Sequence, residues 1–140
     1  MAAETFEIDI NGYLLEADKE SLPKHPGIYF VYEGTYNEEK NTVAIQKLIY
    51  IGESDILNDR IINHEKYDDW KKHVREGNTL CYSTGRVSSA YRERVEAAYI
   101  FKHKPPENEE FTDSFPFDKT TIESSGNTAL LNTKFTVDRT

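Results

Sequence analysis

Cysteine is nearly missing from this chain. Cys81 is the single cysteine among 140 residues, so no internal disulfide can form, and a zinc site built on paired cysteines is excluded. Long apolar runs are missing as well, because no hydrophobic stretch approaches the length of a membrane span. The first residues also lack the basic start and the hydrophobic stretch of a signal peptide. The sequence therefore predicts a cytoplasmic protein with no membrane partner.

Positive charge is also scarce. The chain has 17 Lys and Arg against 25 Asp and Glu, a net charge of −8, whereas proteins that bind phosphate depend on Lys and Arg. The distribution softens this objection to a nucleic-acid partner. Residues 60–104 hold ten Lys and Arg against six Asp and Glu, while the rest of the chain holds seven against nineteen. The positive charge is therefore concentrated in one stretch of the sequence.

The local patterns predict a mixed fold of strands and helices in one domain that spans residues 1–140. β-branched and aromatic residues favour strands at residues 27–32, 43–52 and 79–83. Helical spacing favours helices that begin after Ser54, at Tyr67 and at Ala90. No repeat or linker interrupts the chain, so a single domain is the economical interpretation.

The two ends of the chain give weaker signals. Asn11-Gly12 is a hairpin-turn signal, so the first residues can add an N-terminal hairpin. Near the other end, Ile122 fits an edge strand, and residues 125–132 fit a short final helix.

Two tripeptides stand out against this background. Gly27-Ile28-Tyr29 begins one predicted strand, and Tyr50-Ile51-Gly52 ends the next. Each sets a tyrosine on a strand close to a glycine, the residue that lets another backbone or a ligand approach closely. Either tripeptide alone carries little information, because strands favour tyrosine.

The two tripeptides are followed, in order, by Arg60, His64, Glu96 and Asn108. Together these residues resemble the active-site signature of the GIY-YIG nucleases, and the Arg-x-x-x-His spacing resembles the restriction-enzyme branch. The likeness covers residues 26–108, with extensions at 1–25 and 109–140. It implies an α+β fold in which a small three-stranded antiparallel sheet is flanked by helices. The 21 positions between the tyrosines exceed the spacing in compact members, and the polar loop 33–41 accounts for the excess.

The resemblance implies roles for the first three residues. Tyr29 would be the general base or its partner, although a free phenol titrates near 10 and needs neighbouring positive charge to act near neutral pH. Tyr50 would position the attacking water or the scissile phosphate. Arg60 would hold phosphate oxygens through its planar fork, which a lysine cannot reproduce.

The remaining roles concern the metal and its surroundings. The resemblance implies one Mg²⁺ or Mn²⁺ ion per site, bound by Glu96, and a single carboxylate suffices because Mg²⁺ keeps several of its waters. His64 would relay a proton or orient the nucleophile. Asn108 would hydrogen-bond the phosphate or order the site. The expected function is hydrolysis of phosphodiester bonds in DNA by an endonuclease of restriction, defence or repair type.

Alternatives stay open at this point. Singly, the tyrosines fit core positions, Arg60 and His64 fit a solvated helix face, and Glu96 fits an intrahelical ion pair with Arg92. The acidic balance supports a second hypothesis, a non-catalytic domain that binds nucleic acid or protein. RNA is not excluded as the substrate. The extensions are short, so specificity would come from them, from a homodimer or from a partner protein.

Overall fold

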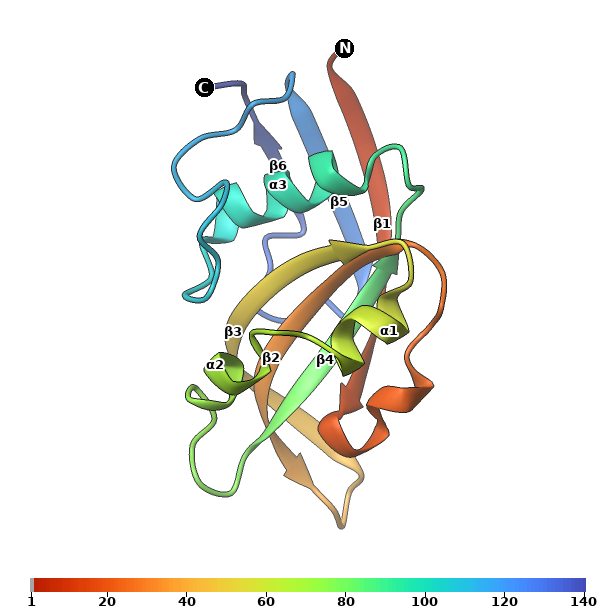
Figure 1. The fold of residues 1–140 in the computed structure, drawn as a ribbon, viewed down its shortest axis with the longest axis vertical. Helices are drawn as coiled ribbons and strands as arrows, with labels where there is room; N and C mark the ends of the chain where they lie inside the picture. The colour runs from red at the N-terminus through yellow and green to blue at the C-terminus, as the bar shows by residue number, and fades with distance from the viewer. Residues whose placement is uncertain (1) are drawn as a thin grey trace.

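A single six-stranded mixed sheet forms the framework of the molecule. The computed structural model describes residues 2–140, and Figure 1 shows their arrangement. The strand order across the sheet is β3-β2-β4-β1-β5-β6. The strands are β1 (Glu4–Leu15), β2 (Gly27–Asn37), β3 (Thr42–Ser54), β4 (Thr79–Arg86), β5 (Thr120–Gly126) and β6 (Lys134–Val137).

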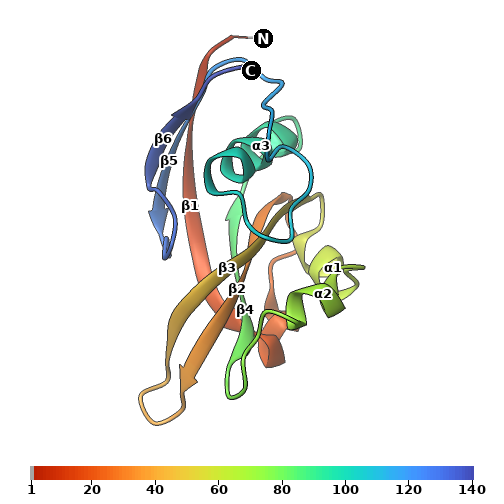
Figure 2. The ribbon, with the colours of Figure 1, turned by 90° about the vertical axis from the view of Figure 1, so that its left-hand side faces the viewer.

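The helices are few and short. A 3-10 helix, η1 (Glu16–Ser21), follows β1, and the α-helices are α1 (Leu57–Ile62), α2 (Tyr67–Lys71) and α3 (Arg92–His103). Figure 2 shows that the sheet curls, with α3 on its concave side and α1 and α2 outside the β2–β3–β4 half. No helix in the described residues is long and apolar enough to cross a membrane.

The predicted three-stranded sheet flanked by helices is wrong. The predicted strands do form β2, β3 and β4, all paired antiparallel, but β4 also pairs with β1. β1 then pairs in parallel with β5, and β5 pairs with β6. The extensions thus complete half of the sheet. The β1–β5 pairing joins segments more than 100 residues apart, and local sequence patterns do not report such contacts.

The predicted N-terminal hairpin is also wrong. Residues 4–15 form one long strand, and the register against β4 shifts between Asn11 and Leu14. Gly12 lets β1 lie close to β4, because a Cβ at position 12 would lie 2.8 Å from the Cβ of Ser83 on β4. Glycine has the same permissive backbone in a bulged strand as in a turn, so the dipeptide did not distinguish the two.

The C-terminal extension departs from expectation in two further ways. Ile122 is fully buried in β5, which lies between β1 and β6 and is not an edge strand. Residues 127–132 form turns and not a helix.

β2 is buried on both of its faces, which explains its continuous apolar sequence. One set of alternate side chains, Ile28, Phe30 and Tyr32, joins the core under α3. The other set, Tyr29 and Val31, joins a second core. That second core is completed by residues of β3, β4, α1, α2 and the segment after η1: Ile49, Leu57, Ile61, Trp70, Leu80, Tyr82 and Leu22.

The tyrosine of the first tripeptide lies over the glycine of the second. Tyr29 and Gly52 are partners across the β2–β3 pair. A Cβ at position 52 would lie 2.2 Å from Cζ of Tyr29 and 2.3 Å from its hydroxyl oxygen. The two tripeptides therefore fit each other sterically, since any larger residue at position 52 would displace the phenol.

We expect Gly52→Ala to destabilise the fold by about 1–3 kcal/mol, the usual cost of overpacking a filled core. In a Tyr29→Leu background, which removes the ring from this contact, the same change should cost clearly less. Urea unfolding of the four proteins of this double-mutant cycle measures the difference. Equal costs in both backgrounds would show that the Tyr29 ring is not what excludes a side chain at position 52.

Candidate active site

Four of the six predicted site residues line one polar cavity of 320 Å³. They are Tyr50, Arg60, Glu96 and Asn108. Tyr50 comes from the face of β3 that α1 and α2 cover, while Glu96 comes from α3 on the other face. The cavity therefore lies at the β3 edge of the sheet. Its lining is completed by Glu53, Glu65, Lys66, Ile100, Glu109 and Glu110.

The other two predicted residues lie directly behind Tyr50. The ring centroids of Tyr29 and Tyr50 are 6.1 Å apart, and those of Tyr50 and His64 are 5.3 Å apart. The Tyr29 and His64 rings are 6.0 Å apart, so the three form one aromatic cluster. The structure thus brings together all six residues, which are spread over 80 positions of the sequence.

Both tyrosines are held in the phenol form. Burial, followed by the neighbouring Tyr50, raises the pKa of Tyr29 well above its usual value, and Tyr29 is only 1% exposed. Burial and the charge of Glu96 raise the pKa of Tyr50 to about 12. Arg60 opposes both shifts. Either tyrosine would therefore need added positive charge in the cavity to ionise near neutral pH, and only the resulting phenolate could accept a proton.

His64 is not on the helix that carries Arg60, contrary to the expected helical pairing. α1 ends at Ile62, and His64 lies in the turn that leads to α2. Its Nδ1 accepts a hydrogen bond from the Lys66 backbone N–H at 3.0 Å, which helps to end the helix.

The imidazole of His64 is neutral and carries its proton on Nε2. Nδ1 is an acceptor, so the neutral ring places the proton on the other nitrogen. Burial, and then the charge of Arg60, lowers the pKa of His64 to about 4. Nε2 is buried and has no hydrogen-bond partner among residues 2–140. The ring packs against Trp70 with the centroids 4.4 Å apart. His64 therefore supplies an unused donor next to the tyrosines.

Arg60 is already engaged by a carboxylate. Its two terminal nitrogens donate to the two Glu65 oxygens at 2.5 and 2.8 Å, the fork geometry that also suits phosphate. This pair lowers the pKa of Glu65 to about 2. The Glu65 side chain is 66% exposed, so it can swing away without leaving a buried charge. Glu65 was not predicted, and only its place next to His64 could have drawn attention to it.

Glu96 lies near more acidic side chains than basic ones. Burial raises its pKa to about 8, and the charges of Glu53, Glu93 and Glu110 add to the effect. Arg92, the nearest compensating charge, is paired instead with Glu53 and Asp55. Glu96 has no ion pair among residues 2–140. A cation bound beside Glu96 would relieve this excess.

The donors present fit a hard, largely hydrated cation. Within the described residues, no group of three His, Cys, Asp or Glu side chains could by itself hold a metal ion. Carboxylates are the anionic groups at the cavity, and Glu96 is the one buried deeply enough to gain from a counter-charge. Mg²⁺ fits such a site because it binds through one or two carboxylates and keeps its remaining waters.

Asn108 acts as a substitute strand partner on the open edge of β3. Its Oδ1 accepts from the Ile51 backbone N–H at 3.0 Å, and its Nδ2 donates to the Ile51 carbonyl at 2.8 Å. Next to it, the Glu107 N–H donates to the Ile49 carbonyl at 3.1 Å. Of the two predicted roles, phosphate contact or ordering of the site, these bonds provide the ordering.

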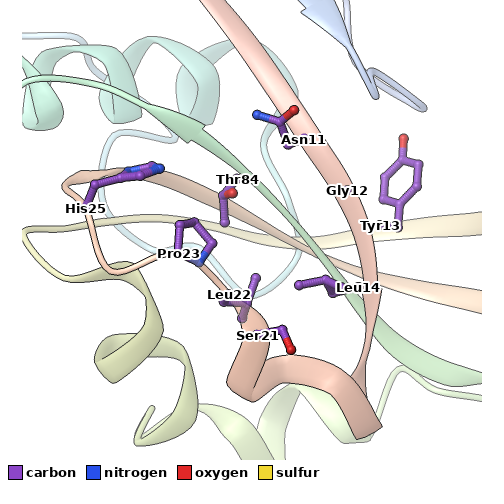
Figure 3. A pocket seen from close by; sticks show the side chains of 9 residues that line it. All are labelled: Asn11, Gly12, Tyr13, Leu14, Ser21, Leu22, Pro23, His25 and Thr84. Carbon is purple, nitrogen blue, oxygen red and sulfur yellow. The ribbon is translucent and has the colours of Figure 1, made fainter.

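A separate hollow of 380 Å³ lies between β1, η1 and β4 (Figure 3). None of the six predicted site residues lines it. The Tyr13 ring points away from it, and His25 Nδ1 donates to the Pro26 carbonyl at 2.9 Å. The hollow offers no convergent set of reactive groups, so the chemistry is concentrated at the β3 edge.

Comparison with known proteins finds no relative. No family model, no curated protein and no solved structure matches this chain. The functional argument therefore depends on the residues and geometry of the cavity.

The raised pKa of Glu96 makes a prediction about stability. The pKa rises from 4.5 to about 8 on folding, so the folded state binds more protons between these values. The free energy of unfolding contributed by Glu96 should therefore fall as the pH rises through this window, by up to about 1.4 kcal/mol per pH unit. Glu96→Gln should lack this loss.

The measurement is urea unfolding from pH 5 to 8.5 in EDTA. The difference between wild type and Glu96→Gln isolates Glu96, because His64 and the other titrating groups are present in both. Glu38→Gln, an exposed position in the turn between β2 and β3 that is not among the charges acting on Glu96, is the control and should keep the wild-type slope. If the free energy of unfolding depends on pH in the same way in wild type and Glu96→Gln, the raised pKa of Glu96 is contradicted.

Proposed function

We propose that the chain is a metal-dependent endonuclease that hydrolyses phosphodiester bonds of DNA with the active-site residues of the GIY-YIG nucleases. The observation that supports it is the convergence of Tyr50, Arg60 and Glu96 at one polar cavity, with Tyr29 directly behind Tyr50. These residues come from four different elements of the fold. The proposed site sits on a larger, six-stranded sheet.

Each side chain has a task that its geometry allows. The fork of Arg60, released from Glu65, would hold two non-bridging phosphate oxygens. The hydroxyls of Tyr50 and Tyr29 would orient the attacking water. Once Tyr29 has released its own proton to solvent, its phenolate would take a proton from that water, and the leaving oxygen would take a proton from solvent. A Mg²⁺ or Mn²⁺ ion held by Glu96 and otherwise by water would supply positive charge to the phosphate and to the phenols. The neutral His64 would donate a hydrogen bond from Nε2.

The acidic lining gives the metal a second task, in binding. Five carboxyl groups, from Glu53, Glu65, Glu96, Glu109 and Glu110, face two cationic side chains, Arg60 and Lys66, and of the five Glu96 is held protonated at neutral pH by its pKa of about 8. A phosphodiester approaching this cavity without a cation would meet net negative charge. DNA binding at the cavity, and not only cleavage, should therefore require a divalent ion.

The acidic balance also supports the second candidate, a non-catalytic domain that binds nucleic acid or protein. The net charge of −8 favours it. Metal-dependent cleavage that is lost with Glu96 separates the two candidates, because a binding domain gives no products. Specificity for a sequence, and a role in restriction, defence or repair, would come from a second copy or a partner protein.

Plasmid cleavage tests the proposal directly. Wild type should nick supercoiled plasmid with Mg²⁺ or Mn²⁺ and not with EDTA. Glu96→Gln should reduce the rate to background, and Tyr29→Phe, which keeps the ring but removes the hydroxyl, should reduce it about 100-fold or more. Glu38→Gln, which lies outside the cavity, should cleave at the wild-type rate.

The nuclease proposal is overturned if the wild type cuts neither plasmid nor single-stranded DNA nor RNA, and if Mg²⁺ does not stabilise the folded wild type more than it stabilises Glu96→Gln. Cleavage of RNA alone would keep the chemistry and change the substrate.

Glu65 should compete with the DNA phosphate for Arg60. Glu65→Gln removes the competing carboxylate and should tighten DNA binding about fivefold in low salt, with a smaller gain in high salt because exposed charges are screened. Glu109→Gln is the matched control, since it removes the same charge from the same cavity without touching Arg60. Fluorescence anisotropy with Ca²⁺ and labelled duplex gives both affinities. Equal gains in the two variants would mean that only net charge matters.

A further inference from the structure

A basic hollow lies further along β3 from the candidate active site. It has a volume of 480 Å³. We call it the basic hollow and define it by its lining residues: Glu33, Gln46, Lys47, Lys72, His73 and Arg75. Three of these side chains are cations, in a chain whose net charge is −8. The concentration of positive charge there is therefore a feature of the fold.

The one carboxylate in the lining, Glu33, is engaged in hydrogen bonds within the protein. Glu33 is 1% exposed, and its oxygens accept hydrogen bonds from the Arg75 backbone and guanidinium and from the Asn78 amide. Burial would raise the pKa of Glu33, but these bonds outweigh it and hold the pKa at about 2. The Arg75 side chain is nevertheless 71% exposed, so its outer face remains open to a ligand.

Lys47 is fixed in position by a chain of hydrogen bonds. Its ammonium lies 2.7 Å from Nδ1 of His73, and Nε2 of His73 lies 2.6 Å from a Glu107 oxygen. An ammonium can only donate, so Nδ1 accepts and Nε2–H donates to Glu107. The half-buried Lys47 is therefore held in place before any ligand arrives, which reduces the entropy lost on binding.

The basic hollow and the candidate active site lie on the same face of the sheet. Lys47 pairs with Glu33 and Tyr50 pairs with Val31, and the two β2 residues are two positions apart. Alternate residues of a strand share a face, and directly paired residues share it too. The register shift in β3 thus brings Lys47 to the side of Tyr50, about 7 Å away along the sheet at the usual rise per residue.

One loop, residues 107–109, contacts both sites. Glu107, which ends the hydrogen-bond chain from Lys47, is followed by Asn108 and Glu109 of the candidate active site. Such a separation corresponds to one or two nucleotide steps along one strand, because successive phosphates are separated by helical rotation as well as by an axial rise of about 3.4 Å.

We propose that the basic hollow binds the DNA backbone one or two nucleotides from the scissile phosphate, with Lys47, Lys72 and Arg75 as phosphate contacts. This inference rests on the proposed function. The basic hollow supplies the attraction that the acidic cavity lacks, so that the two sites divide the work of holding DNA and cutting it.

The salt dependence of binding tests this division. The probe is a fluorescein-labelled 30-base-pair duplex in the presence of Ca²⁺, and the proteins are the full chain and its Lys47→Met, Lys72→Met and double variants. Each lost phosphate contact should lower the slope of log Kd against log salt concentration by about 0.9. The double variant should bind at least fivefold more weakly at low salt.

Two features keep the test interpretable. Lys72 is exposed and pairs only with Asp69 on the surface, so Lys72→Met leaves the hydrogen-bond chain of Lys47 intact. Lys134→Met on β6, at the opposite edge of the sheet, is the control with the same charge change and should keep the wild-type slope.

The outcomes separate this inference from the proposed nuclease. If the wild type cuts plasmid and the lysine variants keep its salt slope, the proposed role of the basic hollow is overturned and the nuclease proposal stands. If the wild type binds DNA but never cuts it, and the variants have lower slopes, the role of the basic hollow is supported and the nuclease proposal is overturned. A wild type that neither binds nor cuts overturns both.

Discussion

The open edge of β3 is the constraint on which the rest of the site depends. An edge strand presents unpaired backbone groups, and a protein must cover or disrupt them. Here the Asn108 side chain bonds both the N–H and the carbonyl of Ile51, and the Glu107 backbone bonds the carbonyl of Ile49. A loop that would otherwise be free is therefore held against the sheet. Its side chains then line the candidate active site, and Glu107 holds His73 of the basic hollow.

This anchoring explains why an asparagine suits the position. An amide side chain carries an acceptor and donors in one plane, as a peptide group does, so it can replace a strand partner. An aspartate would offer only acceptors to Ile51 and would add a further charge near Glu96. Asn108 thus protects the edge without adding to the negative charge around the cavity.

The electrostatics of the cavity favour a cation more than they favour DNA. Glu96 is half-buried and near other acidic side chains, and the arginine that opposes them, Arg92, is paired with Glu53 and Asp55. Both terminal nitrogens of Arg60 are bonded to Glu65, so Arg60 does not offset the negative charge of the other glutamates while that pair is formed. In the proposed nuclease, charge balance therefore orders the events, with the metal ion bound before the phosphate.

The sequence predicted the meeting of the six residues better than it predicted the fold around them. The strands that carry Tyr29 and Tyr50 pair as neighbours along the chain, and such local pairing is visible in patterns of apolar and turn residues. The wider sheet depends on β1 pairing with β5, which no local pattern reports. His64 was misplaced because helical spacing continues past Ile62, while the fold ends α1 there with a bond from Lys66 to the His64 ring. The Arg60–Glu65 pair depends on that turn, so it could not have been anticipated.

The additional strands have a consequence for the site, because they support the helix that carries Glu96. Arg94 is a buried residue of α3, and its guanidinium donates to the Thr120 hydroxyl and to the Asp118 and Lys119 carbonyls at the start of β5. One turn later, the Tyr99 hydroxyl lies within hydrogen-bond distance of Ser124, and its ring packs on Phe135 of β6.

These contacts lie on either side of Glu96 along the helix, so they fix both the position and the rotation of α3. A three-stranded sheet would support such a helix on β2 and β3 alone. In this chain the second half of the sheet forms the other wall, and the curl between the two halves encloses the helix (Figure 2). The N- and C-terminal extensions are therefore part of what aims Glu96 at the cavity, and a chain trimmed to residues 26–108 would lose that support.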